Sequence, residues 1–475
     1  MSHGMECLDK PKDECGVFGI YGSGENVSRI TYFGLHALQH RGQESAGMAI
    51  SDGKDIKVHK GMGLVSEVFN KHILSELNGG VAAVGHVRYS TTGTSSLANA
   101  QPLAFRYLWG TAAFAHNGNL TNAGQLARKL AEKGAVFQST SDTEVFANLT
   151  AKCSEKEIVA ALKKSVSYIR GAYAMVIMTR DKLIGIRDPH GVRPLCLGRL
   201  DEAYILASET CALGTVGAKF ERFIEPGEMV VIDEKGLQSY RIGQEERQGL
   251  CIFEYVYLAR PDSTIDHRNV NLVRMAFGRQ LSKETDIDAD IVIGVPDSGT
   301  TAALGYAQAT GIPFMQGLIK NRYVGRTFIQ PDQQMRDLGV RLKLHPVREI
   351  LRKKRVVMID DSIVRGTTSR KIVQLVRDAG AKEVHMLISS PPIKYSCYYG
   401  IDTSVREELI ASKHDVGEIC RHIGADSLHF LSRKGLLKAV DLPEKKMCTA
   451  CFDGDYPAGV PDEIDMNKYV FEEGW

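Results

Sequence analysis

The sequence of 475 residues lacks a strong excess of charge, because its 59 Lys and Arg are nearly balanced by 57 Asp and Glu. The formal net charge of +2 predicts neither a nucleic-acid-binding protein nor an acidic tail. No stretch approaches ~18 uninterrupted apolar residues, so we expect no helix that crosses a membrane. The first fourteen residues are polar and lack the apolar core of a secretory signal, which predicts a cytoplasmic protein.

Cysteine is also too sparse for a disulfide scaffold, with 10 residues in the whole chain. In a cytoplasmic protein, cysteines serve packing, catalysis or metal binding before disulfides. The composition is 43% hydrophobic and 24% charged, which excludes a wholly disordered chain. The length predicts two to four domains with sizeable cores.

The pattern of predicted strands and helices changes near residue 245. Before it, short β-rich runs alternate with Gly and Asn turns, interrupted by helical stretches around 122–134 and 142–168, which is typical of stacked antiparallel sheets. The polar patch 242–249 resembles a linker. After it, apolar strands alternate with amphipathic helices, which predicts βαβ units on a parallel sheet.

The sharpest motif is VVMIDDSIVRGTTS at 356–369, a buried strand that ends in two acids and is followed by a hydroxyl-rich loop and a helix. Loop amides and a helix N-terminus favour an anion. Adjacent acids repel phosphate but suit a ribose diol or a Mg²⁺ ion carried by a diphosphate. A simpler role is helix capping, which needs only one acid. The loop is neither a Walker loop nor a GxGxxG fingerprint.

This motif resembles the phosphoribosyl-diphosphate (PRPP) signature of type I phosphoribosyltransferases. The resemblance implies that Asp360 and Asp361 hold the ribose hydroxyls and Mg²⁺, with Ser298 after a neighbouring strand as a third Mg²⁺ contact. Gly299-Thr300-Thr301 after Ser298 departs from the family pattern. The implied PRPP-binding residues are Asp360, Asp361, Ser362, Arg365, Gly366, Thr367, Thr368 and Ser369.

A basic, Gly-containing stretch begins at Lys320 and extends to Lys343. Alone, it is typical of a solvated surface loop. Beside a diphosphate site, it looks like a lid that closes over PRPP and excludes water. We therefore add Lys320, Arg326 and Lys343 to the expected PRPP-binding residues.

Cys15 opens the run CGVFGI, where a cysteine is ordinarily just buried. Together with GHVRYST at 85–91, HNGNL at 116–120 and SDTE at 141–144, it resembles the N-terminal nucleophile of class II glutamine amidotransferases. An N-terminal cysteine brings its own base, because a free α-amine has a pKa of ~7.7–8.0. Residues 1–14 must then be a propeptide that is removed before Cys15.

The resemblance implies that Asn117 and the Gly118 amide hold the oxyanion, which is the usual role of such donors. Arg88 would pair with the α-carboxylate of glutamine and Asp142 with its α-ammonium group. Taken singly, Asn117-Gly118 is a turn and Asp142 a helix N-cap. We expect His86 and His116 to be structural.

The pair Cys448 and Cys451 forms a CxxC, with Cys251 and Cys397 as partners for a four-cysteine site. Spacing alone allows either Zn²⁺ or a [4Fe–4S] cluster. The chain resembles the bacterial subgroup of amidophosphoribosyltransferases that carries a [4Fe–4S] cluster at these positions.

Both halves together resemble the amidophosphoribosyltransferase family, cluster-bearing bacterial type. The implied fold is an Ntn-type αββα glutaminase domain (15–245) followed by a type I phosphoribosyltransferase α/β domain with a C-terminal cluster-binding segment (246–475). The implied reaction converts glutamine, PRPP and water into 5-phosphoribosylamine, glutamate and diphosphate, the first committed step of purine synthesis. Purine nucleotides are the expected feedback inhibitors and a homotetramer is the expected assembly.

Two alternatives remain from the sequence. Other glutamine-dependent transferases join a similar first domain to a sugar-isomerase or synthetase half, against which the motif at 356–369 argues. A non-catalytic regulator can use a phosphoribosyltransferase fold to sense PRPP, against which Cys15 and the lid stretch argue.

Overall fold

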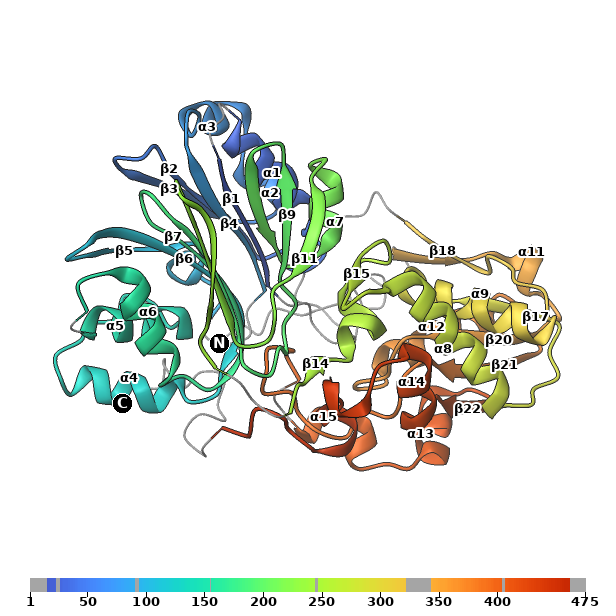
Figure 1. Cartoon of the computed structure of the whole chain (residues 1–475). Helices are drawn as coiled ribbons and strands as arrows, with labels where there is room; N and C mark the ends of the chain where they lie inside the picture. Colours follow the sequence, from blue (N-terminus) through green and yellow to red (C-terminus); the bar gives the residue numbers. More distant parts are fainter. Residues whose placement is uncertain are drawn as a thin grey trace.

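The computed structural model describes residues 15–22, 26–89, 94–153, 155–243, 247–321, 343–403 and 406–461. Figure 1 shows two halves of different architecture, antiparallel sheets coloured blue to green and a parallel sheet coloured yellow to red. The expected change near residue 245 falls between β13 (Gly236–Arg241) and β14 (Leu250–Cys251).

The first half contains two antiparallel sheets. One has the strand order β11-β9-β10-β1-β4-β2-β3 and the other β13-β12-β8-β7-β6-β5. The strands of the first are β1 (Gly16–Tyr21), β2 (Ser45–Ser51), β3 (Ile56–Met62), β4 (Ala82–Arg88), β9 (Cys196–Leu200), β10 (Ala203–Ala207) and β11 (Lys219–Phe223). The second adds β5 (Leu103–Tyr107), β6 (Gly110–Leu120), β7 (Gly171–Met178), β8 (Leu183–Arg187) and β12 (Glu228–Asp233) to β13.

Helices cover the outer faces of these sheets, which gives four layers in the order α, β, β, α (Figure 1). Val17 and Val84 from one sheet pack against Val176 and Val230 from the other, so alternate side chains fill the space between the sheets. Separate apolar cores lie beneath the helices of each outer layer. The helices are α1 (Val27–Ala37), α2 (Val65–Val68), α3 (Lys71–Glu76), α4 (Ala123–Ala131), α5 (Asp142–Lys152), α6 (Ile158–Val166) and α7 (Thr210–Thr215), with a 3₁₀ turn η1 (Leu97–Asn99).

The helical stretches expected in this half are confirmed, but 142–168 divides into α5 and α6, and α1 was not expected. The sequence of α1 contains Val27, Ile30 and Thr31, whose β-branched side chains disfavour a helix in isolation. Packing of Val27, Thr31 and Leu35 against the first sheet stabilises the helix instead.

The second half is built on a parallel sheet of order β17-β20-β21-β22, which confirms the βαβ prediction. In β20, Val357 and Ile359 face one apolar core while Val356 and Met358 face another. Burial on both faces explains the unbroken apolar run before the two acids. The strands are β17 (Ile291–Gly294), β20 (Arg355–Asp360), β21 (Glu383–Ile388) and β22 (Ser427–Phe430).

Long helices flank this sheet: α8 (Val270–Glu284), α9 (Ser298–Thr310), α12 (Thr367–Asp378), α13 (Val416–Ile423) and α14 (Arg433–Val440). Short strand pairs join β14 to β23 (Met447–Cys448), β15 (Thr264–Ile265) to β16 (Arg268–Asn269), and β18 (Leu318–Lys320) to β19 (Leu344–Pro346). The remaining short elements are a π-helical turn η2 (Glu254–Leu258), α11 (Arg348–Leu351), η3 (Arg406–Glu408), η4 (Ile410–Ser412), η5 (Glu444–Lys446) and α15 (Ala450–Asp453).

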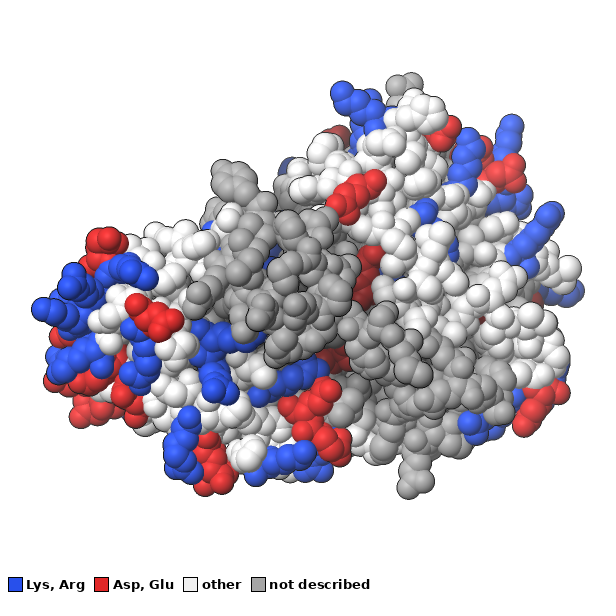
Figure 2. Space-filling model, turned by 180° about the vertical axis from the view of Figure 1, so that it is seen from behind, with Lys and Arg blue, Asp and Glu red and all other residues white. Residues whose placement is uncertain are grey.

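The two halves are hydrogen-bonded where the second begins. The amide of Gly249 donates to the carbonyl of His190 at 2.7 Å, and that of Cys251 donates to Val192 at 3.1 Å. Basic and acidic side chains are interspersed over the described part of the face in Figure 2. None of the helices within the described ranges is long and apolar enough to span a bilayer.

Candidate active sites

Cys15 directly precedes β1, and its side chain is buried with 6% of its surface exposed. Its thiol donates to the carbonyl of Tyr89 at 3.3 Å. Burial raises the pKa of this thiol to about 11, although Arg88 and the Tyr89 bond oppose the shift. Such a thiol is mostly protonated near neutral pH, so it needs a base before it can attack a carbonyl carbon.

Arg88 and Asp142 lie close enough to the Cys15 thiol to act on its pKa. Arg88 ends β4, beside β1 in the register that places Gly16 opposite Val87. Its Nη1 donates to the carbonyl of Thr94 at 3.3 Å. The structure therefore brings together a thiol, a cation and a carboxylate from three separate motifs.

Asp142 is held as a carboxylate by its surroundings. It begins α5, and its Oδ2 accepts from the amide of Leu120 at 3.0 Å. Burial opposes ionisation, but His116 and the amides of Leu120 and Thr143 outweigh it and lower the pKa of the Asp142 carboxyl. The result is a fixed buried negative charge that can pair with an ammonium group.

Asn117 lies in the middle of β6, which contacts β1 and β4 across the sandwich. Its side chain is completely buried, yet neither Oδ1 nor Nδ2 has a hydrogen-bond partner. An unsatisfied buried amide is costly, and active sites are where such groups occur. The neighbouring Gly118 has φ +136°, and a Cβ there would lie 2.0 Å from the carbonyl oxygen of Ala172, so only glycine fits.

His86 and His116 are buried, and each has one ring nitrogen close to a partner. His86 Nε2 lies 2.9 Å from the carbonyl oxygen of His116, and burial lowers the pKa of His86 to about 3. His116 Nδ1 lies 3.5 Å from Asp142 Oδ1, which orients that carboxylate.

A polar cavity of about 300 Å³ lies beside these residues. It is lined by Thr94, which accepts from Arg88, and by Ser141, which caps α5 ahead of Asp142. Hydroxyl and amide side chains of Asn99, Ser139 and Thr140 complete much of the wall. The predicted site residues do not themselves line this cavity, which reaches them only through Thr94 and Ser141.

The second site is at the carboxyl end of β20. Asp360 and Asp361 are buried, and the Asp361 amide donates to Asp360 Oδ1 at 2.9 Å. Ser362 Oγ donates to Asp361 Oδ1 at 2.6 Å, and Ser298 Oγ donates to Asp361 Oδ2. Ser298 follows β17, the parallel neighbour of β20, so the structure joins the two strand ends that the sequence paired.

Gly299 permits a close backbone approach at this point. A Cβ on residue 299 would lie 2.3 Å from the carbonyl oxygen of Ile359 and 3.1 Å from Asp360 Cα. Glycine therefore lets α9 begin directly against the end of β20, close to the acid pair.

The loop after the acids leads into α12 through Gly366, which has φ +80° and directly precedes the helix. Thr368 and Ser369 are buried in the first turn, whereas Arg365 and Thr367 are exposed. Arg365 bonds to Glu408. A helix N-terminus with flanking hydroxyls is a good anion site.

The base of the expected lid is a short strand pair, β18 with β19, in which Lys320 lies opposite Leu344. Lys320 Nζ donates to Asp297 Oδ2 at 2.6 Å, which ties the base to the loop before Ser298. The amide of Asn321 donates to the carbonyl of Lys343 at 2.8 Å. Arg326 lies outside the described residues.

Four cysteines gather at the junction of the halves. Cys251 in β14 lies opposite Cys448 in β23, and Cys397 lies in the segment after β21. Burial raises the pKa of Cys448 to about 12, and the pKa of Cys451 is raised well above its usual value by burial and by the other three thiols. In the part of the chain that the structure describes, no three His, Cys, Asp or Glu side chains are placed to hold a metal ion.

The sequence analysis missed a buried charged cluster beside Cys15. Arg41 Nε donates to the Cys15 carbonyl at 3.1 Å, and its other nitrogens contact Glu209 at 2.6 Å and Glu254 at 2.8 Å. Arg193 Nη1 lies 3.7 Å from Glu254 Oε1. The available signal was a lone charge within an apolar run, such as Glu254 in CIFEYVYL at 251–258.

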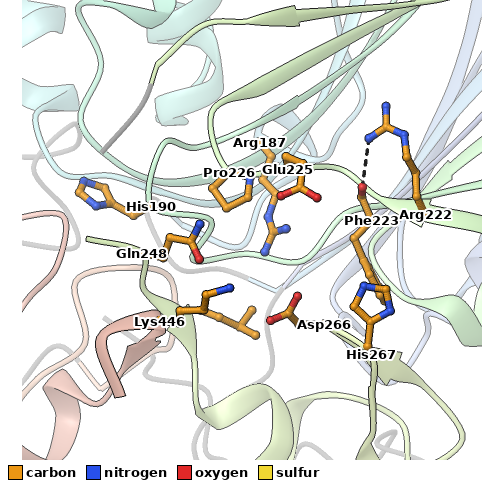
Figure 3. Close-up of a pocket in the computed structure, with 11 residues that line it drawn as sticks. Arg187, His190, Arg222, Phe223, Glu225, Pro226, Gln248, Asp266, His267 and Lys446 are labelled. Carbon is orange, nitrogen blue, oxygen red and sulfur yellow. Dashed lines mark hydrogen bonds between the residues drawn. The ribbon is translucent and has the colours of Figure 1, made fainter. Parts of the chain in front are cut away.

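A further cavity of about 100 Å³ lies between the halves (Figure 3). Arg187, Glu225 and Arg222 line it from the first half, and Asp266 and Lys446 from the second. Arg187 is occupied with the carbonyls of Arg193, Ile224 and Gly191. None of the predicted site residues lines this cavity, so we assign it no part in the chemistry.

The fold and the two sites define a glutamine amidotransferase joined to a phosphoribosyltransferase. Residues 86–215 match the family model of the glutamine amidotransferase domain, and 266–392 match that of the phosphoribosyl transferase domain. Amidophosphoribosyltransferase of Bacillus subtilis (strain 168) is 53% identical over 94% of this chain and 95% of its own length. That of Archaeoglobus fulgidus is 52% identical, covering 94% and 99%.

A solved structure of the Bacillus subtilis glutamine PRPP amidotransferase, complexed with ADP and GMP, matches with a TM-score of 0.90 and 52% identity. It covers 94% of this chain and 98% of that one. The chain belongs to the amidophosphoribosyltransferase family. It is thus an enzyme of purine biosynthesis that carries out the glutamine-dependent amination of PRPP, and this family uses Mg²⁺ with PRPP.

Proposed function

We propose that Cys15, freed by removal of residues 1–14, attacks the amide carbon of glutamine. Its new α-amine takes the thiol proton, which the burial of a thiol with a pKa of about 11 makes necessary. Asn117 Nδ2 and the Gly118 amide stabilise the oxyanion. The single observation that carries this proposal is the buried, unpartnered amide of Asn117 on the strand that faces β1.

Arg88 and Asp142 bind the two ends of the glutamine main chain. Arg88 supplies a buried guanidinium and Asp142 a carboxylate whose pKa is held low despite its burial, mainly by His116. This pair selects an α-amino acid, because a substrate without both charges would leave one buried charge unmatched.

PRPP binds at the second site. The oxygens of Asp360, Asp361 and Ser298 form a set of hard donors that fits Mg²⁺, which neutralises the diphosphate. Residues Ser362, Arg365, Gly366, Thr367, Thr368 and Ser369 surround the 5′-phosphate at the start of α12. Lys320, Arg326 and Lys343 contribute to PRPP binding, and the ammonia released from glutamine displaces the diphosphate from C1 of the ribose.

The four cysteines bind a [4Fe–4S] cluster in this proposal. Cys251, Cys397, Cys448 and Cys451 are supported as a set because each of the other three acts on the pKa of Cys451. Burial raises the pKa of Cys448 and Cys451, so these thiols need a cationic centre to become thiolates together with the other two. Neither glutamine hydrolysis nor phosphoribosyl transfer moves electrons, so the cluster would join distant segments of the chain.

The remaining parts of the proposal concern organisation and partners. The glutaminase domain spans 15–245 and the phosphoribosyltransferase domain 246–475, which the passage from β13 to β14 supports. Purine nucleotides inhibit the enzyme, which the ADP and GMP bound to the Bacillus subtilis protein support. A homotetramer in the cytoplasm completes the proposal and rests on the family resemblance.

The experiment that tests this division of labour measures both nitrogen sources. Cys15→Ala removes the thiolate, so glutamine-dependent synthesis should be abolished while ammonia-dependent synthesis remains. Cys196→Ala, at another buried cysteine, should retain both. Loss of both activities in a folded Cys15→Ala protein, or glutamine hydrolysis that persists in it, would refute the assignment.

A further inference from the structure

A segment of the second half lies directly on the strand that carries Asn117 and Gly118. Asn119 Nδ2 donates to the carbonyl of Tyr398 at 3.0 Å. Gly400 follows with φ +121°, and a Cβ there would lie 3.4 Å from both Cα and C of Gly118. The backbone of residues 398–400 is therefore packed against the peptide of Gly118, and a Cβ on residue 400 would be in direct contact with it.

Buried charges hold this segment in place. Arg193 donates to the carbonyl of Tyr399 from Nε at 3.1 Å and from Nη2 at 2.5 Å. The Tyr399 hydroxyl donates to the carbonyl of Gly459 at 2.8 Å and accepts from the amide of Ala458 at 2.8 Å. Arg193 and Tyr399 are both essentially inaccessible to solvent, so these bonds do not compete with water.

The same charges reach the nucleophile. Arg193 lies 3.7 Å from Glu254, Glu254 contacts Arg41 at 2.8 Å, and Arg41 donates to the Cys15 carbonyl. The chain of contacts thus runs from the second half to both the oxyanion strand and the residue that attacks. Loss of one charged side chain from this buried series would leave the charge of its neighbour unpaired. These side chains are therefore restricted to one arrangement.

The segment also begins at the other site. Ser390, fully buried just after β21, donates from Oγ to the carbonyl of Asp361 at 2.8 Å. Gly400, which contacts Gly118 of the first half, lies ten residues after Ser390. One short stretch of the second half therefore touches the acid pair at one end and the oxyanion strand at the other.

We propose that residues 398–400, held by Arg193, are positioning residues for glutamine hydrolysis, because they set the Gly118 peptide where its amide meets the oxyanion. The proposal deepens the proposed function and depends on it, since it assumes that Gly118 donates to the oxyanion. Oxyanion donors act in the transition state, so their displacement lowers kcat more than it raises KM. Ammonia-dependent synthesis has no oxyanion at this place and does not need the contact.

The test compares Gly400→Ala with Gly110→Ala. A methyl group on residue 400 would lie 3.2 Å from Arg193 Nη2, so that side chain must move by a few tenths of an ångström, and 3.4 Å from Gly118, which is an ordinary van der Waals contact. Gly110 has a similar φ of +113°, but the nearest atom to its Cβ is 3.5 Å away. Both variants therefore carry similar backbone strain, and only Gly400→Ala crowds the Arg193 side chain that holds residues 398–400 and adds a contact with Gly118.

We expect Gly400→Ala to lower the glutamine-dependent kcat about tenfold relative to Gly110→Ala, with the KM for glutamine and the ammonia-dependent kcat within about twofold. If Gly400→Ala does not fold, Asn119→Ala, which removes the bond to Tyr398, should show the same split. Equal glutaminase kcat in the two glycine variants overturns the inference, and so does an equal loss of both activities. Either result leaves the proposed function intact if hydrolysis still requires Cys15, whereas hydrolysis without Cys15 overturns the proposed function itself.

Discussion

The hydroxyl of Ser298 donates to the carboxylate of Asp361, although the two residues stand 63 positions apart at the ends of different strands. Asp361 Oδ1 meanwhile accepts from Ser362, so both oxygens of the carboxylate are oriented by hydroxyl groups. A carboxylate held in this way presents a fixed oxygen surface to a cation, which a freely rotating side chain would not do.

Ser298→Ala should raise the KM for PRPP by about tenfold or more, because a hydrogen bond to a charged group contributes about 1.5–3 kcal/mol. The effect should be measured with ammonia as the nitrogen source, so that glutamine hydrolysis does not enter. Ser282→Ala on α8, whose hydroxyl bonds only its own helix at Arg279, is the matched control. An unchanged KM at limiting Mg²⁺ would argue against Ser298 as part of the Mg²⁺ and PRPP site.

The N-terminal residue of active protein should be Cys15, because a peptide-bonded nitrogen is no base for the thiol. Intact mass and N-terminal sequencing of purified enzyme check this directly. Full glutamine-dependent activity in protein that still carries residues 1–14 would disprove the role of the α-amine.

Asn117→Ala should lower the glutamine-dependent kcat by about 10²–10³, the usual effect of removing one oxyanion donor. Ammonia-dependent synthesis should be unchanged. Asn122→Ala provides the comparison. Asn122 lies in the turn after β6, where its side-chain amide donates to the carbonyl of Tyr168, so its loss should leave glutaminase activity intact. Similar kinetics for both variants would remove Asn117 from the oxyanion site.

Stability should depend on pH through Glu209. Burial opposes its ionisation, but His40 and Arg41 hold the pKa of the Glu209 carboxyl well below its usual range. A lowered folded-state pKa contributes stability above the unfolded-state pKa of ~4.3, and that stability is lost as the pH falls. Glu209→Gln should therefore reduce the free energy of unfolding by about 3 kcal/mol at pH 7.

The difference between the parent chain and Glu209→Gln should shrink by about 1 kcal/mol at pH 3.5, measured by urea unfolding. Glu202→Gln is the control, because that side chain is 94% exposed and pairs only with Arg199 at the surface. A difference that does not change with pH would show that Glu209 acts through packing alone.

Protein purified without oxygen should be brown and contain about four irons and four labile sulfides per chain. Cys448→Ser should yield poorly folded or unprocessed protein, because a cluster held by the four cysteines would join β14, β23 and the segment after β21. Cys196→Ser, equally buried but far in sequence from the CxxC, should keep its iron. Stoichiometric zinc without iron would show that the four cysteines bind zinc instead of a cluster, with the same structural role.

Sequence reasoning reached the residues whose chemistry is local. Asp360 and Asp361 follow a strand that is apolar on both faces, and this pattern is visible without a structure. Cys15, Arg88, Asn117 and Asp142 were predicted from their motifs. The structure places Arg88 and Asp142 near the Cys15 thiol, and Asn117 on β6, which contacts β1 and β4.

What the sequence did not reveal depends on contacts between distant segments. Arg41, Glu209 and Glu254 look like ordinary charged residues until folding buries them together. Helix α1 was missed because its β-branched residues favour strands, and only packing on the first sheet overrides that preference. The contact of Gly400 with Gly118 joins positions 282 residues apart, so no local pattern could indicate it.

The bond between Arg41 and Glu254 can form only late in the synthesis of the chain. Arg41 leaves the ribosome early, whereas Glu254 lies 213 residues further along the chain. N-terminal domains generally begin to fold during synthesis. Arg41 can pair with Glu209 only after residue 209 has emerged from the ribosome, and with Glu254 later still. The set of contacts that supports the Cys15 carbonyl through Arg41 is therefore complete only after translation has passed residue 254.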